Sequence, residues 1–282
     1  MVPEFLAPAS VAEALRDLAG DGALAVGGGT QVGLLVRQGL IAPGRLVWLG
    51  RIGEMRGVAA DPDGGLSIGA ATTLAELASS PAVRSAHPAL AEAAARVGNP
   101  RVRAVATLGG HLVHADPRQD LPPVLLALGA IVRLEVPGKV RRVPLRDFFA
   151  GPFETAVLPG ELLTRIVVAT PSPADRSTYV RFAPGSESDY PTVGVAVRLG
   201  VEAGLVRGGT IGLAGVHPHP LLVDLSDLAG LPPGPEVFAS AGAAAAAACT
   251  PVSDQRGSAD YKRAMAALWT TRALEGLLAL TA

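Results

Sequence analysis

The stretch RVGNPRVRAVATLGGHLVHADPRQDLPP, residues 96–123, decides the interpretation of this chain. A two-glycine turn, Gly109–Gly110, follows Thr107, and an acidic, proline-rich turn follows it and ends at Asp120. A second glycine-rich turn, AVGGGTQVG, occupies residues 25–33. Adjacent glycines let bare backbone amides approach an anion closely. Two such loops, brought together by the fold, would form a cradle for a diphosphate.

The composition predicts a soluble protein with a well-buried core. Of 282 residues, 49% are hydrophobic and 17% charged, and the formal net charge is -1. This near-neutral balance argues against a nucleic-acid-binding protein, which needs a clustered basic face. The short basic run Lys139–Arg142 fits the solvated edge of a hairpin better than a binding patch.

The single cysteine, Cys249, excludes a disulfide within the chain and four-cysteine iron–sulfur ligation by this chain alone. A reducing cytoplasm is therefore the expected location. The N-terminus lacks a secretion signal, and the apolar run 239–248 is too short to span a bilayer. We expect a cytoplasmic protein with no membrane span.

Strands and helices are expected to alternate in the first part of the chain. Ser10–Glu13 and Thr73–Glu76 read as capping boxes that open helices. Further elements are expected as a helix from Pro88 to about Val97, a short helix over 121–129, a hairpin over 131–144 and a strand over 161–169.

The second part reads as strands followed by helices. Residues 170–175 are rich in structure-breaking types and mark a boundary near residue 172. Strands are expected near 179–182, 192–199 and 209–214, and helices over 236–248 and from 260 to about 280. This order predicts an α+β fold, with domains at 1–171 and 172–282. The first domain would comprise two subdomains, roughly 1–55 and 56–171.

Several residues suggest site chemistry without settling it. His111 and His114 lie three residues apart before Asp116, but we expect no metal site, because an Asp-Pro turn interrupts the segment and no cysteine is near. His217 and His219 are expected in a surface turn whose prolines point the rings apart. Asp120 suits acceptance of ribose hydroxyls and also suits an N-cap for the helix at Pro122, and the two roles are not exclusive.

No nucleophile is evident, so we predict no catalytic residue in this chain. There is no Gly-x-Ser-x-Gly elbow, and Cys249 has no activated setting. The first glycine turn is neither a Rossmann fingerprint, since Val32 stands at the sixth place, nor a P-loop. Arg181 and Tyr190, beside a strand, could flank a ring cofactor.

Taken together, TLGGH at 107–111 with ADPRQDLPP at 115–123 resembles the central motif of the FAD-binding medium subunit of molybdenum hydroxylases. That family includes carbon monoxide dehydrogenase and xanthine dehydrogenase. AVGGGTQ at 25–31 looks like its first pyrophosphate loop, and IGAATTLAEL, PGELLTRI and DQRGSADYKR match further family segments in order.

The resemblance implies a bipartite FAD-binding domain of the vanillyl-alcohol-oxidase (PCMH) type, followed by a small α/β C-terminal domain with a mainly antiparallel sheet. It also implies which residues hold FAD, although the family usually has Asn where His111 stands. The implied set is Val26, Gly27, Gly28, Gly29, Thr30, Gln31, Val32, Thr107, Gly109, Gly110, His111, His114, Asp120, Leu163, Arg181 and Tyr190.

The implied function is electron transfer within a three-part oxidoreductase. A large molybdopterin subunit would oxidise the substrate, and a small iron–sulfur subunit would relay electrons to this flavin, which passes them to NAD⁺, oxygen or a quinone. Two other hypotheses remain open. One is a self-sufficient FAD-dependent oxidoreductase on the same scaffold, and the other is a flavin-free binding or assembly protein.

Overall fold

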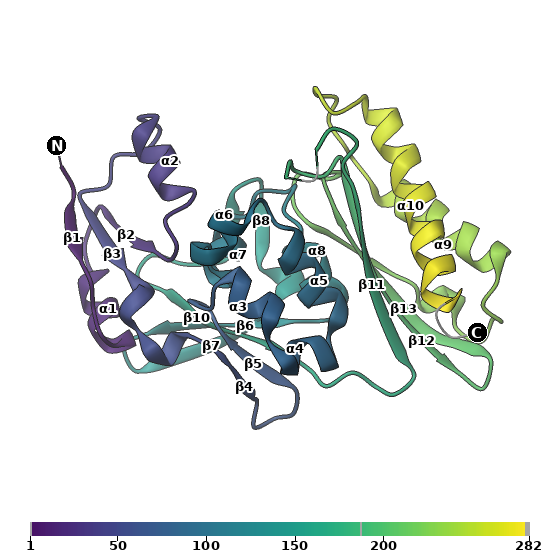
Figure 1. Ribbon diagram of the computed structural model, residues 1–282, viewed down its shortest axis with the longest axis horizontal. Coiled ribbons are helices and arrows are strands. Elements are labelled where there is room, and N and C mark those ends of the chain that lie inside the picture. The colour runs from purple at the N-terminus through teal and green to yellow at the C-terminus, as the bar shows by residue number, and fades with distance from the viewer. Residues whose placement is uncertain (1, 187, 280–282) are drawn as a thin grey trace.

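The computed structural model describes residues 2–186 and 188–279. Its elements form three blocks in a row, with the N-terminal strands at one end and helices α9 and α10 at the other (Figure 1). The predicted α+β fold, with a mainly antiparallel sheet in the C-terminal part, is confirmed. The division at residue 172 remains our proposal.

The first block is a parallel three-stranded sheet in the order β1-β3-β2. Ser10 opens its first helix by accepting a hydrogen bond from the Glu13 amide. A second helix begins at Val32, directly after the first glycine turn, and was not predicted. The elements are β1 (Glu4–Leu6), α1 (Val11–Asp17), β2 (Ala23–Val26), α2 (Val32–Arg37) and β3 (Arg45–Trp48).

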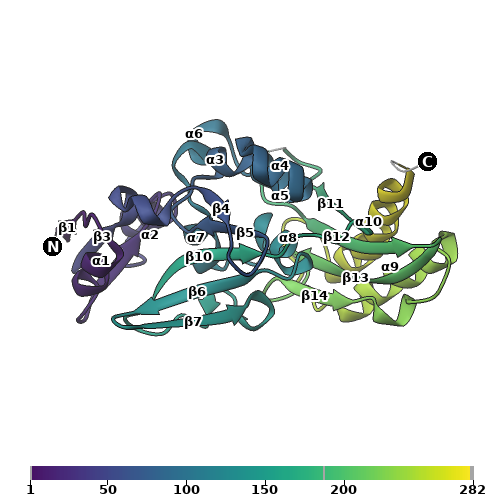
Figure 2. The same cartoon turned by 90° about the horizontal axis from the view of Figure 1, so that it is seen from below.

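The middle block is an antiparallel sheet in the order β4-β5-β10-β6-β7, with α3 to α6 on one side of it (Figure 2). Its strands are β4 (Val58–Ala60), β5 (Leu66–Gly69), β6 (Ile131–Val136), β7 (Lys139–Pro144) and β10 (Leu162–Val168), with a separate hairpin of β8 (Phe149–Gly151) and β9 (Glu154–Thr155). Its helices are α3 (Leu74–Ser79), α4 (Pro81–Ala86), α5 (Pro88–Arg96), α6 (Pro100–Val105), α7 (Leu108–His114) and α8 (Leu121–Ala127). The capping box at Thr73 and the edge position of Lys139–Arg142 are as predicted.

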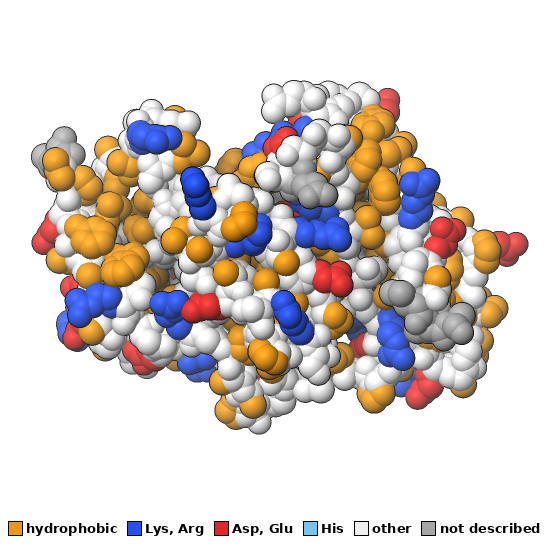
Figure 3. All heavy atoms as spheres, in the orientation of Figure 1, with side chains coloured by type: hydrophobic (Ala, Val, Ile, Leu, Met, Phe, Trp, Pro, Cys, Tyr) orange, Lys and Arg blue, Asp and Glu red, His pale blue; other side chains and the backbone are white. Residues whose placement is uncertain are grey.

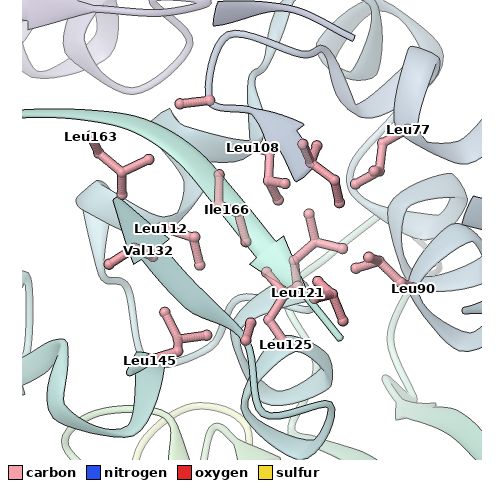
Figure 4. Packing of buried hydrophobic residues seen from close by; sticks show 14 of the residues in the cluster. Leu77, Leu90, Leu108, Leu112, Leu121, Leu125, Val132, Leu145, Leu163 and Ile166 are labelled. Carbon is pink, nitrogen blue, oxygen red and sulfur yellow. The ribbon is translucent and has the colours of Figure 1, made fainter. Parts of the chain in front are cut away.

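The core of this block forms where β10 meets α7 and α8. Leu108 and Leu112, four residues apart on α7, point toward Ile166 of β10, and Leu121 and Leu125 of α8 lie beside them (Figure 4). All five side chains are fully buried. This packing fixes α7, and with it the second glycine turn, against the sheet.

The third block is an antiparallel sheet in the order β11-β12-β13-β14. Helix α10 packs against β11 and β12 and against its neighbour α9, while α8 of the middle block packs against β12, β13 and β14. The elements are β11 (Asp175–Phe182), β12 (Val193–Glu202), β13 (Leu205–Ala214), β14 (Leu221–Asp224), α9 (Pro235–Ala248) and α10 (Ala259–Ala279). Strand β14 was not predicted, and the end of the helix expected to run to residue 280 falls outside the described residues.

Helix α8 is packed against the C-terminal sheet and hydrogen-bonded to it. All seven of its residues are buried. The Ala127 carbonyl at its end accepts hydrogen bonds from Arg198 Nε at 3.1 Å and Thr210 Oγ1 at 2.7 Å. Midway along it, the Pro123 carbonyl lies so close to Gly212 of β13 that a Cβ there would come within 1.9 Å of the oxygen. The two domains therefore meet backbone to backbone.

The surface carries mixed charge. On the face drawn in Figure 3, basic and acidic side chains are interspersed among apolar ones, in keeping with the net charge of -1. Within residues 2–186 and 188–279, no helix is long and apolar enough to cross a membrane.

We expect Gly212→Ala to loosen the docking of the two domains, because the new methyl group would overlap the Pro123 carbonyl. Such overpacking typically costs about 1–3 kcal/mol. Thermal unfolding measures the loss. Gly234→Ala is the matched control, since Gly234 has extended backbone and open space around it. Equal melting temperatures for the two variants would contradict the expected close contact.

Candidate functional site

A cavity of about 1030 Å³ lies where the three blocks meet. Both glycine turns line it, as do residues from β10 and from the segment after β11. Of the residues predicted for the site, those lining the cavity are Gly27, Gly28, Gly29, Thr30, Gln31, Val32, Thr107, Gly109, Gly110, His111, His114, Asp120, Leu163, Arg181 and Tyr190. Val26 is instead buried at the end of β2. The structure thus brings together nearly the whole predicted set.

The two glycine turns touch, as the sequence predicted. A Cβ on Gly28 would come within 1.9 Å of the Val105 carbonyl oxygen, so only glycine allows this approach. The Thr107 hydroxyl accepts a hydrogen bond from the Gly110 amide at 3.2 Å and so caps α7.

Both candidate metal ligands lie on α7, although the segment was not expected to form a helix. Among the described residues no group of three His, Cys, Asp or Glu side chains could hold a metal ion. Burial of the His111 ring lowers its pKa to about 3, and its Nε2 atom is buried with no hydrogen-bond partner among the described residues. Burial also lowers the pKa of His114.

Asp120 stands at the N-cap position of α8, as one interpretation of the sequence expected, but its side chain makes no capping hydrogen bond. Its Oδ1 atom accepts hydrogen bonds from the Tyr179 hydroxyl at 2.7 Å and from Arg181 Nε at 2.9 Å, across the domain boundary. All three side chains are buried. Burial raises the pKa of the Asp120 carboxyl, while Arg181 and Tyr179 oppose that rise.

Tyr179 was missed by the sequence analysis, although a signal for it existed. Tyr179 and Arg181 are two residues apart on β11, so their side chains share one face of the strand. An aromatic hydroxyl and a guanidinium on one strand face form a natural pair of donors for a carboxylate.

Tyr190 closes the cavity by joining the C-terminal domain to the first glycine turn. Its hydroxyl accepts a hydrogen bond from Gln31 Nε2 at 3.1 Å, and the Arg118 guanidinium lies 4.9 Å from its ring centroid. Arg118 in turn makes a two-pronged contact with Asp116, at 3.0 and 2.8 Å. Asp116 thus orients an arginine over an aromatic ring.

His217 and His219 lie in a partly exposed turn, as expected, but the expectation that their rings point apart was wrong. Their ring centroids lie 4.3 Å apart in an edge-to-face arrangement, because the turn curls back and His217 Nδ1 contacts the backbone of His219. Neither residue lines the cavity. Cys249 is buried, and its pKa is raised to about 11, so it is an inert thiol.

Comparisons with known proteins match the whole chain. Residues 2–171 match the model of the FAD binding domain in molybdopterin dehydrogenase, and residues 178–277 match the CO dehydrogenase flavoprotein C-terminal domain. The carbon monoxide dehydrogenase medium chain of Hydrogenophaga pseudoflava is 34% identical, over 97% of this chain and 97% of the relative. The glyceraldehyde dehydrogenase medium chain of Sulfolobus acidocaldarius is 29% identical, over 97% of this chain and 98% of the relative.

A solved structure agrees. A chain of the Hydrogenophaga pseudoflava carbon monoxide dehydrogenase that lacks the Mo-pyranopterin moiety superposes with a TM-score of 0.94 at 34% identity, covering 99% of each chain. Fold and site thus define a flavoprotein subunit of an oxidoreductase. The chain belongs to the FAD-binding medium subunits of the molybdopterin dehydrogenases, of the carbon monoxide dehydrogenase and xanthine dehydrogenase type. Its cofactor is FAD.

The residues present fit this cofactor. The cavity is at the large end for small-molecule sites, as a dinucleotide requires. Its lining combines the backbone of both glycine turns with apolar side chains, among them Leu35, Leu40 and Ile41, and with the ion pair of Asp120 and Arg181.

We expect loss of the Tyr179 hydroxyl to weaken the domain contact measurably. Tyr179→Phe removes one hydrogen bond to a buried carboxylate, worth about 1.5–3 kcal/mol of unfolding free energy. Asp120→Ala should cost more, about 3–5 kcal/mol, because the buried Arg181 guanidinium loses this carboxylate. Denaturant unfolding measures both, with Glu4→Gln at the exposed Arg45–Glu4 pair as a control that should cost under about 1 kcal/mol.

His111 should make the fold sensitive to acid. Because its pKa in the fold is about 3, the unfolded chain takes up a proton on this ring below the ordinary value of 6.5 and the folded chain does not. The folded state therefore loses about 2 kcal/mol between about pH 7 and pH 5. His111→Asn should abolish that share of the loss, so urea unfolding at the two pH values should find a smaller drop in stability for the variant than for the parent. An equal drop in both proteins would contradict the expectation.

Proposed function

We propose that this chain is the electron-transferring FAD subunit of a molybdenum hydroxylase complex. It would receive electrons from the iron–sulfur clusters of a small subunit and pass them to an external acceptor, while a large molybdopterin subunit oxidises the substrate. The observation that carries the proposal is the single cavity lined by both glycine turns together with Asp120, Arg181 and Tyr190. The full-length similarity to medium chains of complexes with different named activities supports it.

The chain's own chemistry fits a relay rather than a substrate-oxidising role. Its one cysteine is buried and cannot ligate a cluster, and the described residues offer no metal group. When bound, FAD supplies the transfer of single electrons or pairs between donor and acceptor. The protein's task is to hold the cofactor and set the charge around it. A reducing cytoplasm suits its unpaired thiol.

Each part of the cavity has a proposed role in holding FAD. The glycine turns would present backbone amides to the diphosphate, since both turns line the cavity and Gly28 lies directly against the backbone of Val105 and Ala106. Asp120 would face the ribose side. Leu163 would lie against the isoalloxazine ring, with Arg181 and Tyr190 beside it. In this arrangement the tie of Arg181 to Asp120 fixes a positive charge at one end of the cavity.

Absorbance spectra of the purified chain, with and without added FAD, test the proposal. We expect a yellow protein that co-purifies with two partner chains and has little substrate turnover alone. Substrate-dependent bleaching of the isolated protein would support a self-sufficient flavoenzyme instead. A colourless chain that takes up no FAD, even when its partners are present, would favour a flavin-free binding protein.

Gly28→Ala should weaken FAD binding by about tenfold or more, because the added methyl group forces the two glycine turns apart. Titration of the chain with FAD, followed by flavin fluorescence, gives the affinity. Gly33→Ala is the control, since a Cβ there meets nothing within 4 Å. The proposed role of the loops fails if both variants bind FAD as the parent does.

A further inference from the structure

Phe153 occupies a strained turn at the cavity. Pro152 and Phe153 join β8 to β9, and Phe153 has a φ of 60°. A turn with proline first and a positive φ at the next residue ordinarily takes glycine at that second place. A bulky side chain there is a conformational outlier that the rest of the structure must hold in place.

The turn is held by α7, the helix that follows the second glycine turn. The Phe153 amide donates a hydrogen bond to the Ala115 carbonyl at 3.0 Å. Ala115 ends α7 and is itself left-handed, with a φ of 51°. The Phe153 ring lies against the His114 ring, with centroids 5.3 Å apart. Two non-glycine residues of left-handed conformation thus link the hairpin to the helix beneath it.

Burial does not account for this strain. Phe153 is 55% exposed, so its ring adds little to the hydrophobic core. The ring nevertheless lines the same cavity as the glycine turns, together with His114, Val157 and Leu163. Strain that persists without a gain in packing is typical of ligand-binding positions.

The position of the ring along the cavity indicates what it would contact. A dinucleotide with its diphosphate at the glycine turns places one ring system at each end of the cavity. Leu35, Leu40 and Ile41, which also line the cavity, belong to the first block. Phe153 is instead hydrogen-bonded to Ala115, in the segment that leads from α7 to Asp120, and Asp120 is bonded to Arg181 of the other domain. We therefore assign Phe153 to the same part of the cavity as Asp120 and Arg181.

We propose that Phe153 is a cofactor-binding residue whose ring, backed by His114, contacts the flavin half of FAD. The inference rests on the proposed function, since it assumes that FAD occupies this cavity. The strained backbone is then the means by which the hairpin turns an aromatic ring toward the cofactor.

The test compares Phe153→Gly, Phe153→Ala and Leu158→Ala. Glycine relieves the strain and removes the ring, whereas alanine removes the ring and keeps the strain. Leu158 is a similarly exposed apolar residue, at 59%, on the chain segment after the same hairpin, and it does not line the cavity. Each full-length variant is titrated with FAD, FMN and ADP, and its thermal unfolding is followed without ligand.

We expect both Phe153 variants to bind FAD and FMN about tenfold more weakly and ADP with unchanged affinity. Ligand-free Phe153→Gly should melt no lower than the parent, and Leu158→Ala should match the parent in every titration. Unchanged FAD and FMN affinities in Phe153→Gly, beside a parent that binds FAD, would overturn this inference alone. The inference would also be overturned if ligand-free Phe153→Gly melted lower than the parent and lost equal affinity for FMN and ADP. That result would show that the Phe153 ring only stabilises the fold. A parent chain that binds no FAD would overturn the proposed function as well.

Discussion

The architecture depends on one buried carboxylate. Asp120 accepts hydrogen bonds from Tyr179 and Arg181 of the other domain, and all three side chains are removed from water. A buried charge is tolerated only when it is paired and hydrogen-bonded, so the two domains must stay docked for either charge to be satisfied. The same carboxylate lines the cavity. The same group therefore contributes both to the docking of the two domains and to the lining of the cavity.

Local chemistry made much of the fold predictable. The glycine turns, the capping box at Thr73 and the proline-flanked helix α8 follow from backbone rules that act over a few residues. Helix α7 escaped prediction because Gly109 and Gly110 lower its intrinsic helix propensity. Its Leu108 and Leu112 nevertheless pack on β10, and that long-range contact outweighs the local preference.

The sequence predicted many of the residues that line the cavity, but not the hydrogen bonds between them. Family resemblance identified which residues line the cavity, yet not that Asp120 is held by Tyr179, because 59 residues separate the two in sequence. The link from Gln31 to Tyr190 spans 159 residues. The error at His217 and His219 has the opposite origin. There a local proline rule was applied, but His217 Nδ1 contacts the backbone of His219 and the two rings lie together.

Helix α8 shows how closely the two domains are interdependent. Its first turn is tied through Asp120, its middle lies against Gly212, and its last carbonyl is capped by Arg198 and Thr210. Every one of those partners is translated after the helix itself. During synthesis on the ribosome, the N-terminal domain would thus emerge before the sheet that covers α8. At that stage the Asp120 carboxylate would lack its hydrogen bonds from Tyr179 and Arg181. Maturation of the N-terminal domain has to wait for β11, β12 and β13, so the order of residues along the chain delays formation of a finished cofactor pocket until the second domain has been made.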